Sequence, residues 1–275
     1  MHESGVIPGC DWAMTKKIFL SLFVLTLVAC ASGPAKVPFP AFIQADELPT
    51  VFIASLPGAR ASQLAGDPMT RRTSNRVDLP AAWQGTSGGV PGRSMELFVL
   101  AGTLKLADIE LGPGGYAYLP AGSLGFNITT YDGARILYFV SDDEPEAVIR
   151  SPIIINADLL DWRPTASAGI STKELRRDPG TGATTWLMRI EAGSSVPWQS
   201  SSVVREGYLV EGDYQHAECV DGKAVAGPYM PGGYFYRPAE AVNGGPLSGG
   251  SSAAVWLLRE ATAGTETAHT GCPAP

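Results

Sequence analysis

Histidine is the residue type that this sequence most lacks, with three in 275 residues. Only His216 and His269 lie beyond the N-terminal segment, so no domain can assemble a site from several imidazoles. Basic residues are also few, with 20 Lys and Arg against 27 Asp and Glu and a formal net charge of -7. Because nucleic-acid binding relies on a basic surface, we expect no nucleic-acid partner.

The chain also has few charged residues and shows little long helical periodicity. Charged residues make up 17% of the sequence, whereas glycine and proline number 32 and 22. Frequent glycine and proline between short apolar stretches are typical of many short strands joined by turns. The composition therefore predicts an all-β protein.

No apolar run is long enough to cross a bilayer as a helix. Residues 18–28 form an apolar stretch of the length found in export signals, and two lysines, Lys16 and Lys17, precede it. Residues 1–13 lack signal character, so we predict that translation starts at Met14 and that the signal peptide ends at residue 29.

The end of this signal predicts a lipid anchor. The segment Leu27-Val28-Ala29-Cys30 resembles a bacterial lipobox, whose cysteine becomes the lipidated first residue of the mature protein. Ala31 and Ser32 follow, without the aspartate that retains lipoproteins at the inner membrane. We therefore predict lipidation of Cys30 and a membrane partner through that anchor. The expected location is the outer membrane, facing the periplasm.

Two cysteines, Cys219 and Cys272, remain in the part of the chain that is expected to fold. In an oxidising compartment they could form a disulfide that holds the C-terminal tail to the second half. Spacing alone does not establish bond geometry, so two free thiols are an equal alternative.

Two phrases recur in the same order along the chain, which indicates a duplicated domain. Residues 113–121 (PGGYAYLPA) match residues 231–239 (PGGYFYRPA), and residues 96–102 (ELFVLAG) match residues 206–212 (EGYLVEG). The spacings are 118 and 110 residues. The chain is therefore predicted to consist of segments in this order: signal peptide (1–29), tether (30–48), first domain (49–144), second domain (152–262) and irregular tail (263–275).

The repeated phrases resemble the two motifs of the cupin superfamily. In that family an acidic residue precedes a strand ending in glycine, and a Pro-Gly-Gly turn leads into a strand ending in Pro-x-Gly. The first copy completes the second motif as Pro120-Ala121-Gly122, whereas Glu240 replaces the glycine in the second copy. The resemblance implies two tandem double-stranded β-helix (jelly-roll) barrels. The second half further resembles the cupin domain of ChrR-type anti-sigma factors.

The cupin resemblance implies a metal site of two His, one Glu and a third His inside the barrel. In the second copy the matching positions hold Gln199, Ser201, Glu206 and Asn243, and in the first copy Gln84, Glu96 and Gly125. Transition metals prefer imidazole and thiolate to amide oxygens, so we expect neither barrel to carry a catalytic metal. The alternative is one divalent ion in the second domain, held by Gln199, Glu206 and Asn243.

A barrel without a metal still encloses a cavity that can receive one ligand. We predict that the second barrel binds a small polar molecule through Trp198, Gln199, Glu206, Tyr208 and Asn243. Further aromatic residues of this half have core packing as an alternative role, chiefly the alternating tyrosines, and these are Tyr234, Tyr236 and Trp256. His216 and His269 are expected to face solvent.

The predicted function is that of an envelope-anchored lipoprotein, with degenerate metal positions, that binds a small polar ligand or has a structural role. The alternative is a metal-dependent cupin enzyme, an oxygenase or isomerase. In that case Glu206 is the candidate catalytic residue, because a buried and unpaired carboxyl would have a raised pKa. A homodimer is expected by analogy with other cupins.

Overall fold

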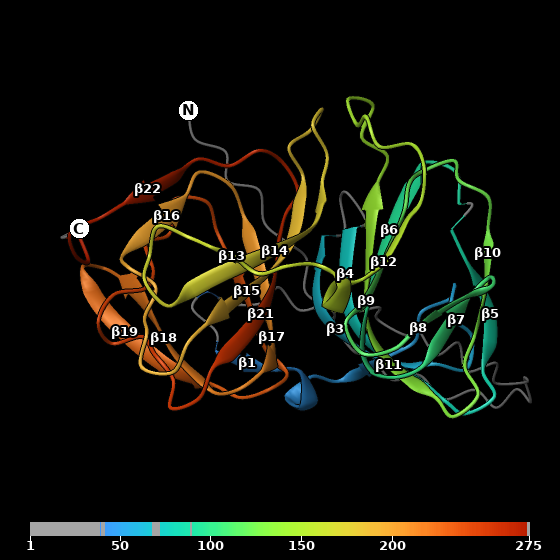
Figure 1. Cartoon of the computed structure of the whole chain (residues 1–275), viewed down its shortest axis with the longest axis horizontal. Helices are drawn as coiled ribbons and strands as arrows, with labels where there is room; N and C mark the ends of the chain where they lie inside the picture. The colour runs from blue at the N-terminus through green and yellow to red at the C-terminus, as the bar shows by residue number, and fades with distance from the viewer. Residues whose placement is uncertain (1–38, 40–41, 68–71, 89, 274–275) are drawn as a thin grey trace, which may run out of the picture. The chain divides into compact units, whose positions relative to one another are not determined.

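The structure is a computed structural model that describes residues 39, 42–67, 72–88 and 90–273. Its regular elements are β-strands and two 3-10 helices, η1 (Ala45–Glu47) and η2 (Ala157–Leu159) (Figure 1). The all-β prediction is therefore confirmed. The predicted signal peptide, Met14 and Cys30 lie outside the described residues. Within the described part, no helix is long and apolar enough to cross a membrane.

The first half of the chain forms a barrel from a seven-stranded and a four-stranded antiparallel sheet. The larger sheet contains, in spatial order, β12 (Ile153–Asn156), β9 (Gly115–Leu119), β6 (Arg93–Gly102), β11 (Ala134–Asp142), β4 (Arg72–Leu79), β3 (Arg60–Asp67) and β2 (Thr50–Val51). The smaller sheet contains β5 (Gln84–Ser87), β10 (Phe126–Thr129), β7 (Leu104–Leu106) and β8 (Ile109–Leu111).

The second half repeats this topology. Its seven-stranded sheet contains β1 (Ile43–Gln44), β20 (Gly233–Arg237), β17 (Arg205–Glu211), β21 (Ala254–Glu260), β15 (Thr184–Ile190), β14 (Ile170–Arg177) and β13 (Arg163–Pro164). Two strand pairs complete the barrel, β16 (Gln199–Ser201) with β22 (Glu266–Ala268) and β18 (Tyr214–Val220) with β19 (Lys223–Tyr229). The equal strand order in both large sheets supports the duplication inferred from the repeated phrases.

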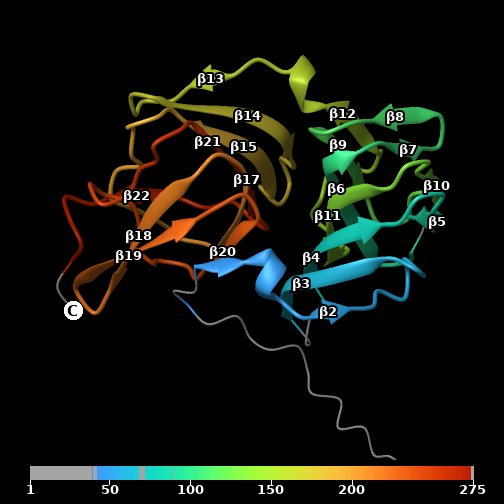
Figure 2. The ribbon, with the colours of Figure 1, turned by 90° about the horizontal axis from the view of Figure 1, so that it is seen from below.

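Each barrel receives a strand from the segment that precedes the other repeat (Figure 2). Strand β12 lies beyond the predicted end of the first domain, yet it pairs with β9 of the first sheet. Strand β1 lies before the first repeat and pairs with β20 of the second sheet. The prediction that the second domain begins at residue 152 was therefore wrong, because β12 completes the first sheet.

The predicted tether and tail both contain ordered structure. Residues 43–48 include β1 and η1, and Ala45 is fully buried. In the tail, β22 pairs with β16, and Cys272 forms a disulfide with Cys219 across a Cα–Cα distance of 5.3 Å. Backbone pairing therefore holds both segments to the second barrel, and the tail is not irregular throughout.

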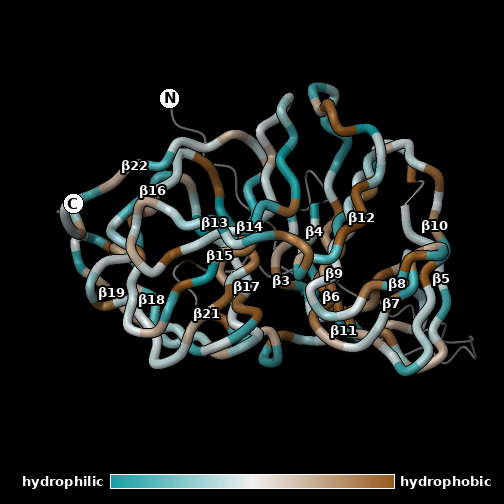
Figure 3. Tube along the Cα trace, viewed as in Figure 1, coloured by the Kyte–Doolittle hydropathy of each residue, from teal (hydrophilic) through white to brown (hydrophobic). Residues whose placement is uncertain are grey.

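Both faces of the large sheets are buried. Along β6, the residues Met95, Leu97 and Val99 belong to the interior core of the first barrel, while Phe98 points to the opposite face. Alternation of side chains along a strand places these two sets on opposite sides of the sheet. Apolar stretches are visible along β12, β9 and β6 in Figure 3.

The outer faces of the two large sheets pack against each other through one apolar cluster. Its fully buried members come from both barrels and from the segments that precede them, and they are Ala45, Leu64, Phe98, Tyr116, Tyr118, Leu137, Phe139, Ala157, Leu175, Leu187, Tyr208, Tyr234 and Leu257. We call this cluster the inter-barrel core. Because its members come from both halves, the inter-barrel core joins the two barrels into one unit.

Candidate functional site

A small cavity lies inside the second barrel, with a volume of about 20 Å³. A water molecule needs roughly 10–15 Å³ by this measure, so the cavity has room for one or two water-sized groups. Its lining combines apolar and polar side chains, which are Met188, Ile190, Val196, Gln199, Arg205, Tyr214, His216, Phe235, Arg237, Asn243, Trp256 and Leu258.

Two of the predicted ligand-binding residues, Gln199 and Asn243, meet in this cavity. They form an isolated antiparallel bridge in which each backbone N–H donates to the other residue's carbonyl, at 2.8 and 2.9 Å. The Asn243 side-chain amide also donates to the Gln199 carbonyl at 3.1 Å. The structure therefore brings these two positions together as the duplicated motifs predicted.

Glu206 and Tyr208 do not face the cavity, and the prediction that they do was wrong. Strand alternation turns Glu206 and Tyr208 toward the inter-barrel core and turns Arg205 toward the barrel interior. The inward position at this end of β17 therefore carries a guanidinium instead of a carboxylate. Arg205 pairs across strands with Arg237, which lines the same cavity.

The aromatic residues expected around the ligand are divided among four environments. Trp198 is absent from the cavity lining and packs over Gly245, where a Cβ would lie 2.1 Å from the indole ring. Tyr234 belongs to the inter-barrel core, and Tyr236 is 40% exposed. Trp256 alone lines the cavity as predicted.

His216 is buried inside the barrel, so its predicted exposure to solvent was wrong. Its Nε2 lies 2.8 Å from Nη2 of Arg237, and its ring is stacked on Phe235 with a centroid distance of 6.0 Å. A guanidinium can only donate, so Nε2 is the acceptor and the ring proton of the neutral form is on Nδ1. Burial and the Arg237 charge lower the pKa of His216 well below its usual value, which keeps the ring neutral.

Both cavity arginines are paired with carboxylates that are not part of the lining. Nε and Nη2 of Arg237 donate to the buried Glu218 carboxylate at 3.0 and 2.6 Å. Arg205 pairs with Glu260 at 2.8 Å and with Glu266 at 3.3 Å. Glu260 and Glu266 belong to β21 and to the C-terminal strand β22. The arginine charges are therefore balanced from outside the cavity wall.

The cavity side chains do not suit a divalent cation. Among the lining residues, one imidazole is the only nitrogen donor of the kind that such metals prefer, and it accepts a hydrogen bond from Arg237. A guanidinium has no lone pair to offer, and two of them would repel a cation. In the part of the chain that the structure describes, no three His, Cys, Asp or Glu side chains lie together as metal ligands.

The first barrel offers no comparable site at the matching positions. Met95 occupies the place in β6 that corresponds to Arg205 in β17, seven residues before the glycine that ends each motif. It belongs to the apolar interior core, where Ser87 donates to its sulfur at 3.1 Å. Gln84 is exposed, and Glu96 faces the inter-barrel core instead of the interior.

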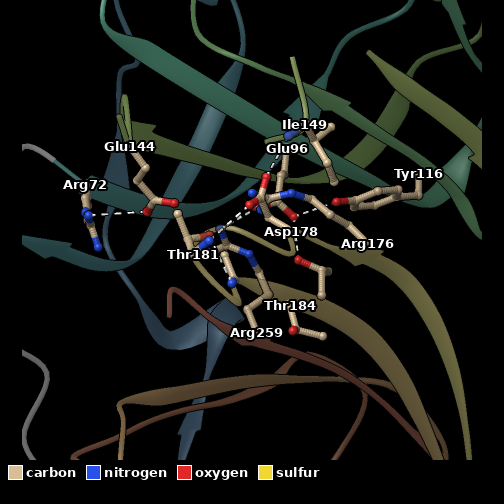
Figure 4. A network of polar contacts seen from close by, with 12 residues as sticks. Arg72, Glu96, Tyr116, Glu144, Ile149, Arg176, Asp178, Thr181, Thr184 and Arg259 are labelled. Atoms are coloured by element: carbon tan, nitrogen blue, oxygen red, sulfur yellow. Dashed lines mark hydrogen bonds and ion pairs between the residues drawn. The ribbon is translucent and has the colours of Figure 1, made fainter. Parts of the chain in front are cut away.

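The two motif carboxylates, Glu96 and Glu206, meet at the inter-barrel core and share Arg259. Nη2 of Arg259 donates to Glu96 at 2.9 Å (Figure 4). Its Nη1 donates to Glu206. Arg176 adds a second guanidinium, with 3.1 Å between its Nη1 and Glu96. We call these four residues the inter-barrel charge cluster.

Hydroxyl donors complete this cluster in a reciprocal pattern. Thr185 of the second barrel donates to Glu96 of the first at 2.6 Å, and Ser74 of the first donates to Glu206 of the second at 2.6 Å. Tyr116 and Tyr234 donate to the carboxylate of their own barrel, each at 2.8 Å. Both carboxylates are thus fully engaged at the boundary between the barrels.

The C-terminal strand crosses the second barrel beside the cavity. Strand β22 pairs with β16, which carries the cavity residue Gln199. Nε2 of His269, which was expected to face solvent, lies 3.0 Å from Oγ of Ser200, and the residue is half-buried. We refer to residues 261–273 as the C-terminal strap.

Sequence reasoning missed Arg205, Arg237 and Glu218 because both sides of the large sheet are buried. A strand with one wet face shows which residues point inward by alternating apolar and polar character. In β17 the interior and the inter-barrel core both take apolar residues, so alternation gives no direction. The signal in the sequence was an arginine within each motif, Arg205 before Glu206 and Arg237 before Pro238, and the structure pairs the two across strands.

The two barrels and their shared boundary define a double-barrel protein with the cupin fold, and solved structures support this class. A putative dioxygenase from Nostoc punctiforme is 18% identical, with a TM-score of 0.66 over 83% of this chain and 86% of its own. Protein Ylba from E. coli is 20% identical, with a TM-score of 0.62 over 79% and 89%. A mutant of oxalate decarboxylase from Bacillus subtilis is 12% identical, with a TM-score of 0.60 over 82% and 78%.

These identities show a common fold and do not transfer an activity. The family model for the domain of unknown function DUF4437 matches residues 54–263, and the chain belongs to that family. No curated protein matches the sequence.

Proposed function

We propose that this protein is a double cupin without a catalytic metal whose second barrel binds a small polar ligand. The observation that supports it is the inward position of Arg205, which replaces a ligand carboxylate with a guanidinium at the cavity. Gln199 and Asn243 supply neutral polar groups beside it. The volume of about 20 Å³ restricts the ligand to a few atoms unless side chains move.

Metal content tests the first part of this proposal. Residues 31–275 purified without an affinity tag would be incubated with Mn, Fe, Ni, Cu and Zn and measured by inductively coupled plasma mass spectrometry. We expect near-zero occupancy throughout. One tightly held ion per chain would contradict the proposal and favour the alternative of a metal-dependent enzyme, in which case Gln199, Glu206 and Asn243 would be mutated first.

The anchored location is part of the same proposal. Its support is the lipobox-like segment that ends at Cys30 and the disulfide Cys219–Cys272, which suits an oxidising compartment. Labelling cells with a radioactive fatty acid should label the wild-type chain and not a Cys30→Ala variant. Equal labelling of both chains would contradict lipidation at this residue.

Two narrower points stay proposals as well. The second barrel is proposed to be related to ChrR-type cupin domains, on the likeness of residues 206–213 and 233–238. A homodimer is proposed by analogy with other cupins. Light scattering of the purified chain should give twice the monomer mass, and a monomer mass would contradict it.

A further inference from the structure

The face that the second barrel turns toward its cavity carries donors and no carboxylate. Its polar groups are two guanidiniums, one imidazole, two amides, the Tyr214 hydroxyl and the Trp256 indole N–H, while the acidic partners Glu218, Glu260 and Glu266 are absent from the lining. Electrostatic complementarity with such a wall requires a negatively charged ligand or one that accepts hydrogen bonds.

One guanidinium nitrogen in this wall has no hydrogen-bond partner among the described residues. The Arg237 side chain is 4% exposed, and its Nε and Nη2 are engaged by Glu218 and His216. Among the described residues, nothing accepts a hydrogen bond from its Nη1. Because Nε and Nη2 are occupied, Nη1 is the nitrogen of Arg237 that is available for a ligand in the cavity.

The two arginines stand directly opposite each other on neighbouring strands. Arg205 of β17 and Arg237 of β20 are register partners, and both line the cavity. Glu218, Glu260 and Glu266 balance their charges from outside the lining. An anion between the two guanidiniums would accept a further hydrogen bond from Arg237.

Neutral His216 adds no charge to the lining, and it is engaged by Arg237 and Asn243. Since its Nε2 accepts from Arg237, its proton is on Nδ1. Burial and the Arg237 charge lower the pKa of His216, so the ring does not contribute a third cation near neutral pH. Since each arginine is already paired with a carboxylate outside the cavity, the lining has no excess positive charge for a multiply charged anion.

We infer that the cavity of the second barrel is a binding site for one small monovalent anion, with Arg237 and Arg205 as its principal contacts. A volume of about 20 Å³ admits a halide, nitrite or formate and excludes phosphate, sulfate and dicarboxylates. This inference rests on the proposed function and adds the charge and size of the ligand. Gln199, whose side chain has no hydrogen bond among the described residues, lies beside the same volume.

Thermal unfolding of the full mature chain tests the site. Sodium formate, sodium nitrite and sodium bromide would be titrated at constant ionic strength maintained with sodium gluconate, whose anion is too large to enter. We expect a saturable rise in Tm of about 3–6 °C at ten times Kd. Formamide, which matches formate in size without its charge, should give no such rise.

Two variants and one control locate the effect. Arg237→Lys should abolish the saturable rise, and Gln199→Leu, at a half-buried residue, should weaken the apparent affinity for formate at least threefold even if Arg237→Lys does not fold. Arg135→Gln changes an exposed ion pair in the first barrel and should respond like the wild type.

The outcomes separate this inference from the proposed function. A saturable response to formamide but not to formate would overturn the anion site and leave a barrel that binds a neutral polar ligand. No saturable response to any of the three anions would also overturn the inference. A stoichiometric metal ion in the purified chain would instead overturn the proposed function itself.

Discussion

Buried charged side chains lie together in two separate places in this protein. The inter-barrel charge cluster joins Glu96, Glu206, Arg176 and Arg259, and the cavity contains Arg205 and Arg237. In the cluster, protein donors engage both carboxylates, although Nε of Arg176 and Nε of Arg259 have no partner among the described residues. In the cavity, the arginines are paired with carboxylates outside the lining. Glu206 is therefore a structural contact between barrels, and the candidate catalytic role considered from the sequence loses its geometric basis.

We expect Arg259→Met to be strongly destabilising. Arg259 bridges Glu96 and Glu206, and its guanidinium lies 3.9 Å from the ring centroid of Phe139. Removing one partner leaves buried carboxylates unpaired, at a cost of about 3–5 kcal/mol. Urea unfolding measures this loss in free energy of unfolding.

A matched control comes from an exposed ion pair. Arg135→Met removes the pair with Asp78 on the surface of the first barrel and should cost less than about 1 kcal/mol. Adding Glu96→Gln to Arg259→Met should restore part of the loss, because one uncompensated charge disappears. Equal effects of Arg259→Met and Arg135→Met would show that the cluster is not a main contributor.

Acid should destabilise the protein through Glu96. Burial raises the pKa of this carboxyl, but Arg259 and Arg176 outweigh burial and bring the pKa to about 2, below its ordinary value of 4.5. The depressed pKa means that the stabilisation is present above about pH 4.5 and is lost as the pH falls toward 2. It amounts to about 3 kcal/mol for a shift of this size.

The Glu96→Gln variant separates the contribution of Glu96 to acid destabilisation from the contributions of other carboxyls. Between pH 6 and pH 3, its free energy of unfolding should fall less steeply than that of the wild type. His216, held neutral in the fold, contributes loss of stability in the same direction below about pH 6.5, in both proteins. Parallel pH curves for the two proteins would contradict the role assigned to Glu96.

Several strands belong to a different barrel from the one that their position in the sequence suggests. Strand β1 lies before the first repeat but completes the sheet of the second barrel. Strand β12 lies before the second repeat but completes the sheet of the first barrel. The C-terminal strap adds β22 to β16 and ends in the disulfide Cys219–Cys272. These additions cover sheet edges that would otherwise be exposed.

Loss of the disulfide should release the C-terminal strap. The bridge spans 53 residues, and chain entropy gives it a stabilisation of about 4 kcal/mol as an upper limit. In a Cys272→Ser variant we expect faster hydrogen exchange at the amides of β16 and β22, together with a lower Tm. Exchange in β4 of the first barrel is the internal control and should not change.

Unchanged exchange in β16 would show that backbone pairing alone holds the C-terminal strap. The hydrogen bonds of this region are few, since β16 and β22 pair over three residues each. A short, exposed strand pair is marginal by itself, which is why we expect the disulfide to matter.

For the whole molecule, the inter-barrel core and the exchanged strands make the halves interdependent. The described part of both barrels belongs to one compact unit. Backbone N–H groups of Val148 and Ile149, in the connection between the barrels, donate to Asp178 of the second barrel at 2.9 to 3.2 Å. The two barrels are thus joined by these hydrogen bonds of the connecting segment as well as by the inter-barrel core.

We expect that residues 49–151 and 152–275 do not form stable soluble domains when they are expressed separately. Each would lose its exchanged strand and expose its side of the inter-barrel core, and exposed apolar faces of this size promote aggregation. Circular dichroism and light scattering would measure folding and association. Two soluble, cooperatively unfolding halves would contradict this interdependence.

The sequence by itself determined the β architecture, the duplication and the scarcity of imidazoles. These follow from local signals: glycine and proline turns, repeated motifs such as residues 113–121 and 231–239, and the residue types at motif positions. The motif positions also predicted that Gln199 and Asn243 lie at one site, and the two residues form a bridge in the structure.

Tertiary structure alone decided which side of the sheet each residue of β17 faces. Both sides are buried, so Glu206 and Arg205 could not be distinguished by an apolar and polar alternation. The strand exchange, the Arg237–Glu218 pair and the Arg259 bridge join residues far apart in sequence. Such contacts depend on how two sheets pack, which no local pattern in the chain encodes.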